Sequence, residues 1–176
     1  MSLANSQQTL KNSIRASGVA LHTGCKVNMT LRPAEVNAGV IFKRTDLPQS
    51  VAFKACAGSV GDTQMATSLK SQGYNLSTVE HMMSALSGLG IDNVTIEVDG
   101  EELPIMDGSA APFVFLLQSA GIVDQSAKKR FLRILKRIEV REGDATASLA
   151  PHEGFKLSYT LEYDHPVFAA HEHTAC

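Results

Sequence analysis

The residues in this chain that could most readily do chemistry are Glu80 and His81, within the run Ser77-Thr78-Val79-Glu80-His81. An imidazole can hold a metal ion, and an adjacent carboxylate can take a proton from water bound to that metal. This pairing is typical of metal-assisted hydrolysis. The same run also fits a purely structural explanation, because Ser77 and Glu80 have the S-x-x-E spacing of a helix capping box. The pair alone leaves both interpretations open.

The composition is that of a folded globular protein. The 176 residues are 44% hydrophobic and 19% charged, and the net charge is −2 at pH 7. A chain of this length can build one core, or one domain and part of a second. We expect no general nucleic-acid binding from this charge. We also expect no signal peptide and no transmembrane segment, because no apolar run approaches the roughly 20 residues that cross a bilayer.

The cysteines point to a reducing compartment. Cys25, Cys56 and Cys176 are an odd number, lie far apart and form no C-x-x-C motif. This spacing argues against a disulfide scaffold and against a thiolate zinc finger. We therefore expect a cytoplasmic protein.

The strands that must position Glu80 and His81 follow from the hydrophobic pattern. Val27, Met29 and Leu31 alternate with polar residues, which predicts a half-buried strand. Further strands are predicted over residues 39–43, 51–55 and 94–99. The last of these is followed by Asp99-Gly100, a strong hairpin signal.

Two helices complete the predicted first domain. One runs from about Thr78 to Leu89, with an apolar stripe opposite His81. The small residues around His81 suggest a second face that another group approaches closely. The other helix is capped by Ser109 and closed by Gly121. The predicted fold class is α+β, with a two-layer domain of sheet and helices over residues 1–123. The stripe on the first helix consists of Val79, Met82, Met83, Leu86 and Leu89.

After the first domain we expect a polar linker at residues 124–130 and a partial second domain at 131–176. The pattern predicts a three-stranded antiparallel meander over 132–140, 145–149 and 155–163. Its apolar face must pack against the first domain, another subunit or the rest of an unfinished domain. Seven of the 16 basic residues lie between 128 and 141, as a solvated strand edge or as a contact for nucleotide phosphates or an anionic membrane. The apolar face carries Phe155, Leu157, Tyr159, Leu161 and Tyr163.

Six short motifs occur in a characteristic order. They are GVALHTG at 18–24, GDTQMAT at 61–67, STVEH at 77–81, GLGIDN at 88–93, PIMDGS at 104–109 and DHPVF at 164–168. Each motif is modest by itself, but together they span nearly the whole chain. In this order they resemble the UDP-3-O-acyl-N-acetylglucosamine deacetylase family, zinc enzymes of lipid A biosynthesis in Gram-negative bacteria.

The resemblance implies a fold, a reaction and a set of site residues. The family has two similarly folded α+β domains with the active site between them. It removes the N-acetyl group of UDP-3-O-acyl-N-acetylglucosamine by hydrolysis, and a hydrophobic passage takes the acyl chain. By resemblance, His81 is a ligand of Zn²⁺ and Glu80 is the general base. The substrate-binding residues implied in the same way are Leu21, His22, Met65 and Thr78.

The chain departs from the family after the last motif. The family's His-Lys-x-x-x-Asp helix, which supplies two further zinc ligands, is absent, as are a Thr near the oxyanion and a later His. Because catalytic zinc normally takes three protein ligands, we expect this chain to be inactive alone. The alternative is a non-catalytic homologue that acts as a binding or dimerising module, as a homodimer or with a complementing chain, through the meander. His171, His173 and Cys176 could replace missing ligands, although polar tails are usually mobile.

Overall fold

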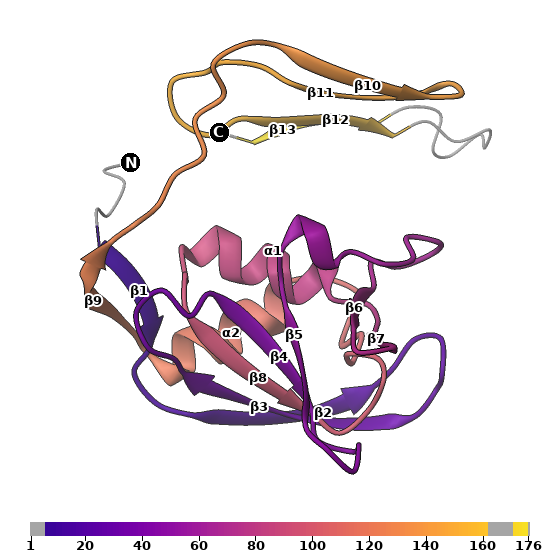
Figure 1. The fold of residues 1–176 in the computed structure, drawn as a ribbon, viewed down its shortest axis with the longest axis vertical. Coiled ribbons are helices and arrows are strands. Elements are labelled where there is room, and N and C mark those ends of the chain that lie inside the picture. The colour runs from indigo at the N-terminus through magenta and orange to yellow at the C-terminus, as the bar shows by residue number, and fades with distance from the viewer. Residues whose placement is uncertain (1–5, 162–170, 176) are drawn as a thin grey trace. The chain divides into compact units, whose positions relative to one another are not determined.

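The computed structural model describes residues 6–161 and 171–175 (Figure 1). The chain divides into two compact units, Met1–Lys129 and Arg130–Cys176. The described residues contain two α-helices and many strands, so the predicted α+β class is confirmed. Neither of these helices has the length and hydropathy needed to span a membrane.

A five-stranded sheet forms the centre of the first unit. Its strand order is β2-β3-β8-β4-β5, and only the β4–β8 pair is parallel. The helices α1 and α2 lie on one face of this sheet (Figure 1). The bounds are β2 Ile14–Val19, β3 Lys26–Pro33, β4 Val40–Arg44, β5 Val51–Lys54, β8 Val94–Val98, α1 Glu80–Leu89 and α2 Ala111–Ala120.

Smaller elements surround the sheet. β1 (Ser6–Leu10) pairs with β9 (Ile122–Lys128), and β6 (Leu69–Ser71) pairs with β7 (Tyr74–Leu76). A short 3₁₀ helix, η1, covers Ala57–Ser59.

The core is built where the sequence alternates. Val27, Met29 and Leu31 are at most 2% exposed, which confirms the predicted half-buried strand. Met29 faces Val98 and Leu31 faces Ile96 across the β3–β8 register. The helices complete this core with Met82, Ala85, Leu86, Phe113 and Leu117. Ala85, one of the small residues on the helix beside His81, is therefore a core residue.

The capping-box interpretation of Ser77 and Glu80 is wrong. The residue before the first turn of α1 is Val79, and no side chain caps the helix. The Glu80 carboxylate instead accepts a hydrogen bond from the backbone N–H of Thr67. The helix ends at Leu89 as predicted, since Gly90 adopts φ +71° and its N–H bonds to Leu86 O.

The hairpin predicted at Asp99-Gly100 is also wrong. Both edges of β8 are already occupied, by β3 and by β4, so no edge is free for a returning strand. The chain after the turn instead forms isolated bridges, from Glu102 to Ser77 and from Pro104 to Ala20. These bridges place Glu102 beside the residues just before α1, and Pro104 beside the end of β2.

The polar stretch expected as a linker is largely strand, because β9 includes residues 124–128. Gln125 on this strand is bonded within the structure, whereas Asp124, Ser126 and Lys128 are exposed. Asn93, which is 1% exposed, donates through Nδ2 to Gln125 at 2.7 Å and to Gln7 at 2.8 Å. Amides that satisfy one another let a polar sequence occupy a sheet.

The second unit has antiparallel strands, but as two hairpins and not as one meander. β10 (Ile138–Glu142) pairs with β11 (Ala145–Leu149), and β12 (Leu157–Leu161) pairs with β13 (His171–Ala175). β12 therefore pairs with a strand of the tail and not with β11, and β10 begins later than predicted. The DHPVF motif, Tyr163 and Cys176 lie outside the described residues.

Candidate functional site

Glu80 connects the start of α1 to the loop that carries Met65. Its Oε2 accepts a hydrogen bond from Thr67 N at 3.0 Å. Met65 lies two residues earlier, is 88% exposed and has φ +60°. A methionine in this left-handed region is uncommon. The structure therefore joins the Glu80 carboxylate to the Met65 loop through one main-chain contact.

Thr78 is buried beneath this helix start. It is 3% exposed and has φ +58°. Its hydroxyl donates a hydrogen bond to Oε1 of Glu102 at 3.1 Å. Glu102 is 2% exposed, so the bond lies inside the protein.

Leu21 and His22 lie in the loop between β2 and β3. The backbone N–H of His22 donates to Glu102 Oε1 at 3.0 Å, and that of Thr23 donates to Oε2 at 3.0 Å. Leu21 is 57% exposed. The same buried carboxylate thus contacts the loop of Leu21 and His22 and the turn of Thr78.

The environment of Glu102 favours its ionised form. Burial by itself would raise the pKa of this carboxyl group. The N–H donors of His22 and Thr23, with the hydroxyl of Thr78, outweigh that effect and hold the pKa below its ordinary value. Glu102 is therefore a buried carboxylate that remains charged at neutral pH.

His81 follows Glu80 and is partly exposed. A second carboxylate lies near it, that of Asp107 in the PIMDGS motif. The pKa of Asp107 is lowered, first by hydrogen bonds from the Ser109 hydroxyl and backbone N–H and to a smaller extent by the charge of His81. The imidazole thus has an acidic neighbour on a loop far along the chain.

The predicted site residues are gathered around the start of α1 by these contacts. Glu80 contacts the Met65 loop, and Thr78 and His22 share Glu102. Sequence reasoning missed Glu102 and gave Asp107 no role. Asp107 was inside a quoted motif, whereas the signal for Glu102 was only an acid placed directly before the apolar pair Leu103-Pro104.

The described residues do not by themselves fit a catalytic zinc ion. Such an ion takes three protein ligands. His81 offers one imidazole, yet the described part of the chain brings no three His, Cys, Asp or Glu side chains together as a metal site. The side chains of His171 and His173 and all of Cys176 lie outside what the structure describes.

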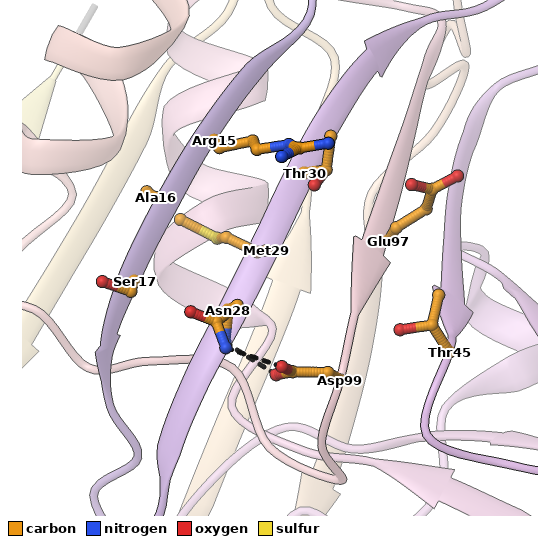
Figure 2. Close-up of a pocket in the computed structure, with 9 residues that line it drawn as sticks. All are labelled: Arg15, Ala16, Ser17, Asn28, Met29, Thr30, Thr45, Glu97 and Asp99. Carbon is orange, nitrogen blue, oxygen red and sulfur yellow. Dashed lines mark hydrogen bonds between the residues drawn. The ribbon is translucent and has the colours of Figure 1, made fainter.

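A polar depression lies elsewhere, on the sheet face away from the core (Figure 2). Asn28 closes one end by donating to Asp99 through its backbone N–H and through Nδ2, both at 2.7 Å. Glu97 is paired with Arg32 at 2.9 Å. None of the predicted catalytic or substrate-binding residues is among the nine that line it, which are Arg15, Ala16, Ser17, Asn28, Met29, Thr30, Thr45, Glu97 and Asp99.

Comparisons with known proteins agree on one family. Residues 7–175 match a family model described as LpxC: UDP-3-O-acyl N-acetylglycosamine deacetylase. The chain is similar to proteins named UDP-3-O-acyl-N-acetylglucosamine deacetylase from several bacteria. Identity is 60% for Saccharophagus degradans, over 92% of this chain and 54% of the relative. It is 56% for Marinobacter nauticus, over 96% and 56%, and 57% for Stenotrophomonas maltophilia, over 93% and 54%. The chain spans about half the length of these relatives.

Proposed function

The chain belongs to the UDP-3-O-acyl N-acetylglycosamine deacetylase family, and on that basis we propose that it acts in removing the N-acetyl group of UDP-3-O-acyl-N-acetylglucosamine in lipid A biosynthesis. The observation that carries the proposal is the position of Glu80 and His81. Both are partly exposed at the start of α1, and Glu80 is held there by the N–H of Thr67. A fixed carboxylate beside an accessible imidazole suits hydrolysis.

Glu80 is the proposed general base. Its Oε2 accepts the Thr67 N–H, while Oε1 accepts no hydrogen bond from the described residues. That oxygen is available to take a proton from an attacking water. The water oxygen bonds to the acetamide carbonyl carbon, the carbon–nitrogen bond breaks, and the nitrogen gains a proton. The products are acetate and the free amine of the sugar.

Zinc is the proposed cofactor, with His81 as one ligand. When bound, zinc lowers the pKa of its coordinated water and polarises a carbonyl group. Because the described residues do not complete a zinc site, we propose that the other ligands come from outside them. We further propose that the 176-residue chain alone is not an active deacetylase.

The substrate contacts proposed by resemblance differ in exposure. Leu21 is 57% exposed and Met65 is 88% exposed, which suits contact with an acyl chain. His22 is exposed as well, on the same loop as Leu21. Thr78 is buried, so its proposed contribution is to the shape of the helix start. A reducing compartment, the cytoplasm, is proposed because Cys25 and Cys56 are free thiols.

A second candidate function is association through the β10–β11 hairpin. Ile138 pairs with Leu149 and Val140 with Ala147 across this hairpin. Ile138, Val140 and Leu149 are 50%, 64% and 56% exposed. An apolar sheet face of this kind favours a partner, either a second copy or a complementing chain. Light scattering on the purified chain tests it: a monomer at all concentrations contradicts the dimer.

Acetate release from UDP-3-O-acyl-N-acetylglucosamine tests the proposed reaction. One sample is the 176-residue chain. The other, which we call the joined protein, is this chain fused to the portion of the Saccharophagus degradans relative that it does not cover. We expect release by the joined protein, its loss with a chelator, and its recovery with zinc. Zinc-dependent release by the 176-residue chain alone contradicts the incomplete site. No release by the joined protein contradicts the proposed reaction.

A further inference from the structure

One buried carboxylate joins the two segments on which the proposed site depends. We call residues 20–25 the His22 loop and residues 77–81 the α1 turn. Oε1 of Glu102 accepts a hydrogen bond from His22 N at 3.0 Å and another from the Thr78 hydroxyl at 3.1 Å. Its Oε2 accepts from Thr23 N at 3.0 Å. The His22 loop and the α1 turn are therefore bonded to the same side chain.

The main chain around Glu102 is held by bonds that do not involve its carboxylate. Ser77 N donates to Glu101 O at 2.9 Å, and Leu103 N donates to Ser77 O at 3.1 Å. Ile105 N donates to Val19 O at 3.0 Å, just before the His22 loop. Because these bonds already join the segments, the carboxylate is not needed merely to fasten them together. The backbone hydrogen bonds hold the main chain of Glu102 in place, and its carboxylate accepts hydrogen bonds from the His22 loop and the α1 turn.

The hydrogen bond to Glu102 matters most at Thr78, because the backbone of Thr78 is strained. Its φ of +58° is an outlier for a β-branched residue. Such conformations persist only where the surrounding structure over-determines them, and they cluster at functional sites. Glu80 and His81 follow two and three residues later. The backbone at Thr78 therefore sets the direction in which α1 presents Glu80 and His81.

Burying the charge of Glu102 costs free energy that its hydrogen bonds must offset. A carboxylate that is 2% exposed has lost its hydration and depends on its donors. A neutral amide would avoid this cost, but it could not serve every donor at this position. Its nitrogen would face either the N–H of Thr23 or the donors of His22 and Thr78. An ionised carboxylate is the side chain of this length that accepts on both sides.

We propose that Glu102 is a positioning residue of the deacetylase site, which fixes the His22 loop and the α1 turn in one geometry. Through these segments it acts on substrate binding and on the proton transfer by Glu80. The catalytic part of this inference rests on the proposed function. The coupling of the two segments rests on the hydrogen bonds alone.

The coupling is tested in the 176-residue chain by amide hydrogen exchange and backbone NMR. In Glu102→Gln we expect exchange at His22 and Thr23 to rise at least tenfold and the amide signals of Glu80 and His81 to move. Thr78→Val is expected to move the same two signals and to raise exchange at His22.

The matched control is Thr9→Val, which removes a different buried hydroxyl. Thr9 is 6% exposed in β1 and donates to Asn93 O at 2.6 Å. This variant is expected to leave the signals of Glu80 and His81 in place. Unmoved signals in folded Glu102→Gln overturn the proposal. If Glu102→Gln does not fold, Thr78→Val tests the proposal instead. Unchanged amide exchange at His22 in Thr78→Val also contradicts it.

A kinetic measurement on the joined protein separates positioning from simple stabilisation. Glu102→Gln should lower kcat and raise KM, since both segments lose their acceptor. Thr78→Val should mainly lower kcat, and Thr78→Ser, which keeps the hydroxyl, should lose less of kcat. If Glu102→Gln and Thr9→Val lose similar stability and neither changes kcat or KM, Glu102 is only structural. Absence of acetate release by the unsubstituted joined protein contradicts the proposed function. The coupling of the His22 loop and the α1 turn is then still tested by hydrogen exchange.

Discussion

The surroundings of two glutamates near the start of α1 suit them to different tasks. Glu80 is partly exposed, and only its Oε2 accepts a hydrogen bond from the described residues. Glu102 is buried, and both of its oxygens accept. A carboxylate oxygen that accepts no hydrogen bond can take a proton from water. A carboxylate whose two oxygens both accept hydrogen bonds from a loop can fix the position of that loop. This difference is why we assign proton transfer to Glu80 and positioning to Glu102.

Replacing Glu80 by glutamine in the joined protein tests the first assignment. The amide keeps the size of the side chain and can still accept the N–H of Thr67, but it cannot take a proton from water. We expect kcat to fall by about 10²- to 10⁴-fold, the usual contribution of a general base. Zinc content, measured by elemental analysis, should not change. His81→Ala is the contrasting variant and should lose zinc; equal kcat for Glu80→Gln and the unsubstituted protein contradicts the role of base.

The lowered pKa of Glu102 predicts how stability depends on pH. A carboxyl group whose pKa is lower in the folded state stabilises the fold above its unfolded value, here 4.5. The stabilisation is lost as the pH falls through the folded-state pKa. Urea unfolding of the 176-residue chain and of Glu102→Gln should therefore differ most near neutral pH, by about 1–3 kcal/mol. The difference should shrink towards pH 3, and a difference that grows in acid contradicts the prediction.

The β6–β7 hairpin tests how turn chemistry supports an element beside the site. Its two loop residues, Gln72 and Gly73, have φ of +50° and +82°, as in a type I′ turn. Glutamine is poorly suited to a left-handed conformation that asparagine tolerates. Gln72→Asn should raise the free energy of unfolding by about 0.5–1 kcal/mol.

Thermal unfolding followed by circular dichroism measures this effect, with Gln72→Ala as the control. Alanine has no polar group to favour the left-handed conformation, so this control should not gain stability. If both variants unfold at the same temperature, turn conformation is not what limits the hairpin.

The sequence was sufficient where structure depends on local periodicity. Val27, Met29 and Leu31 form the buried side of β3 because alternation in a strand directly selects a face. Gly90 and Gly121 end the helices because both adopt positive φ. Glu80 and His81 are proposed from a motif for the same local reason, since the two residues are adjacent in the chain.

The sequence was insufficient where distant partners decide. Glu102 bonds to Thr78, 24 residues away, and to His22, 80 residues away, and no local pattern reveals either contact. Glu80 has the spacing of a capping box with Ser77. In the structure, however, the residue before the first turn of α1 is Val79, and Glu80 accepts a hydrogen bond from Thr67. The polar residues of β9 concealed a strand because their amide partners lie in β1 and near β8.

The distribution of buried side chains predicts which part of the molecule folds independently. The buried apolar residues of the described chain all lie between Leu10 and Ala120. Lys129 closes this unit: its Nζ donates to Gly90 O at 2.6 Å and pairs with Asp92 at 2.5 Å, and its side chain is 11% exposed. A fragment of residues 1–129 should therefore unfold cooperatively, with a free energy within the usual range of about 5–15 kcal/mol.

Two further fragments make this prediction sharp. Residues 1–121 lack β9, the strand that pairs with β1, and this fragment should unfold at a lower urea concentration than residues 1–129. Residues 130–176 should show no cooperative transition, because the described part of this segment forms two-stranded hairpins with no buried apolar side chain, and such hairpins are marginal in water. Urea titration by circular dichroism compares the three. A cooperative transition in residues 130–176, or its absence in residues 1–129, contradicts the assignment of the core to the first unit.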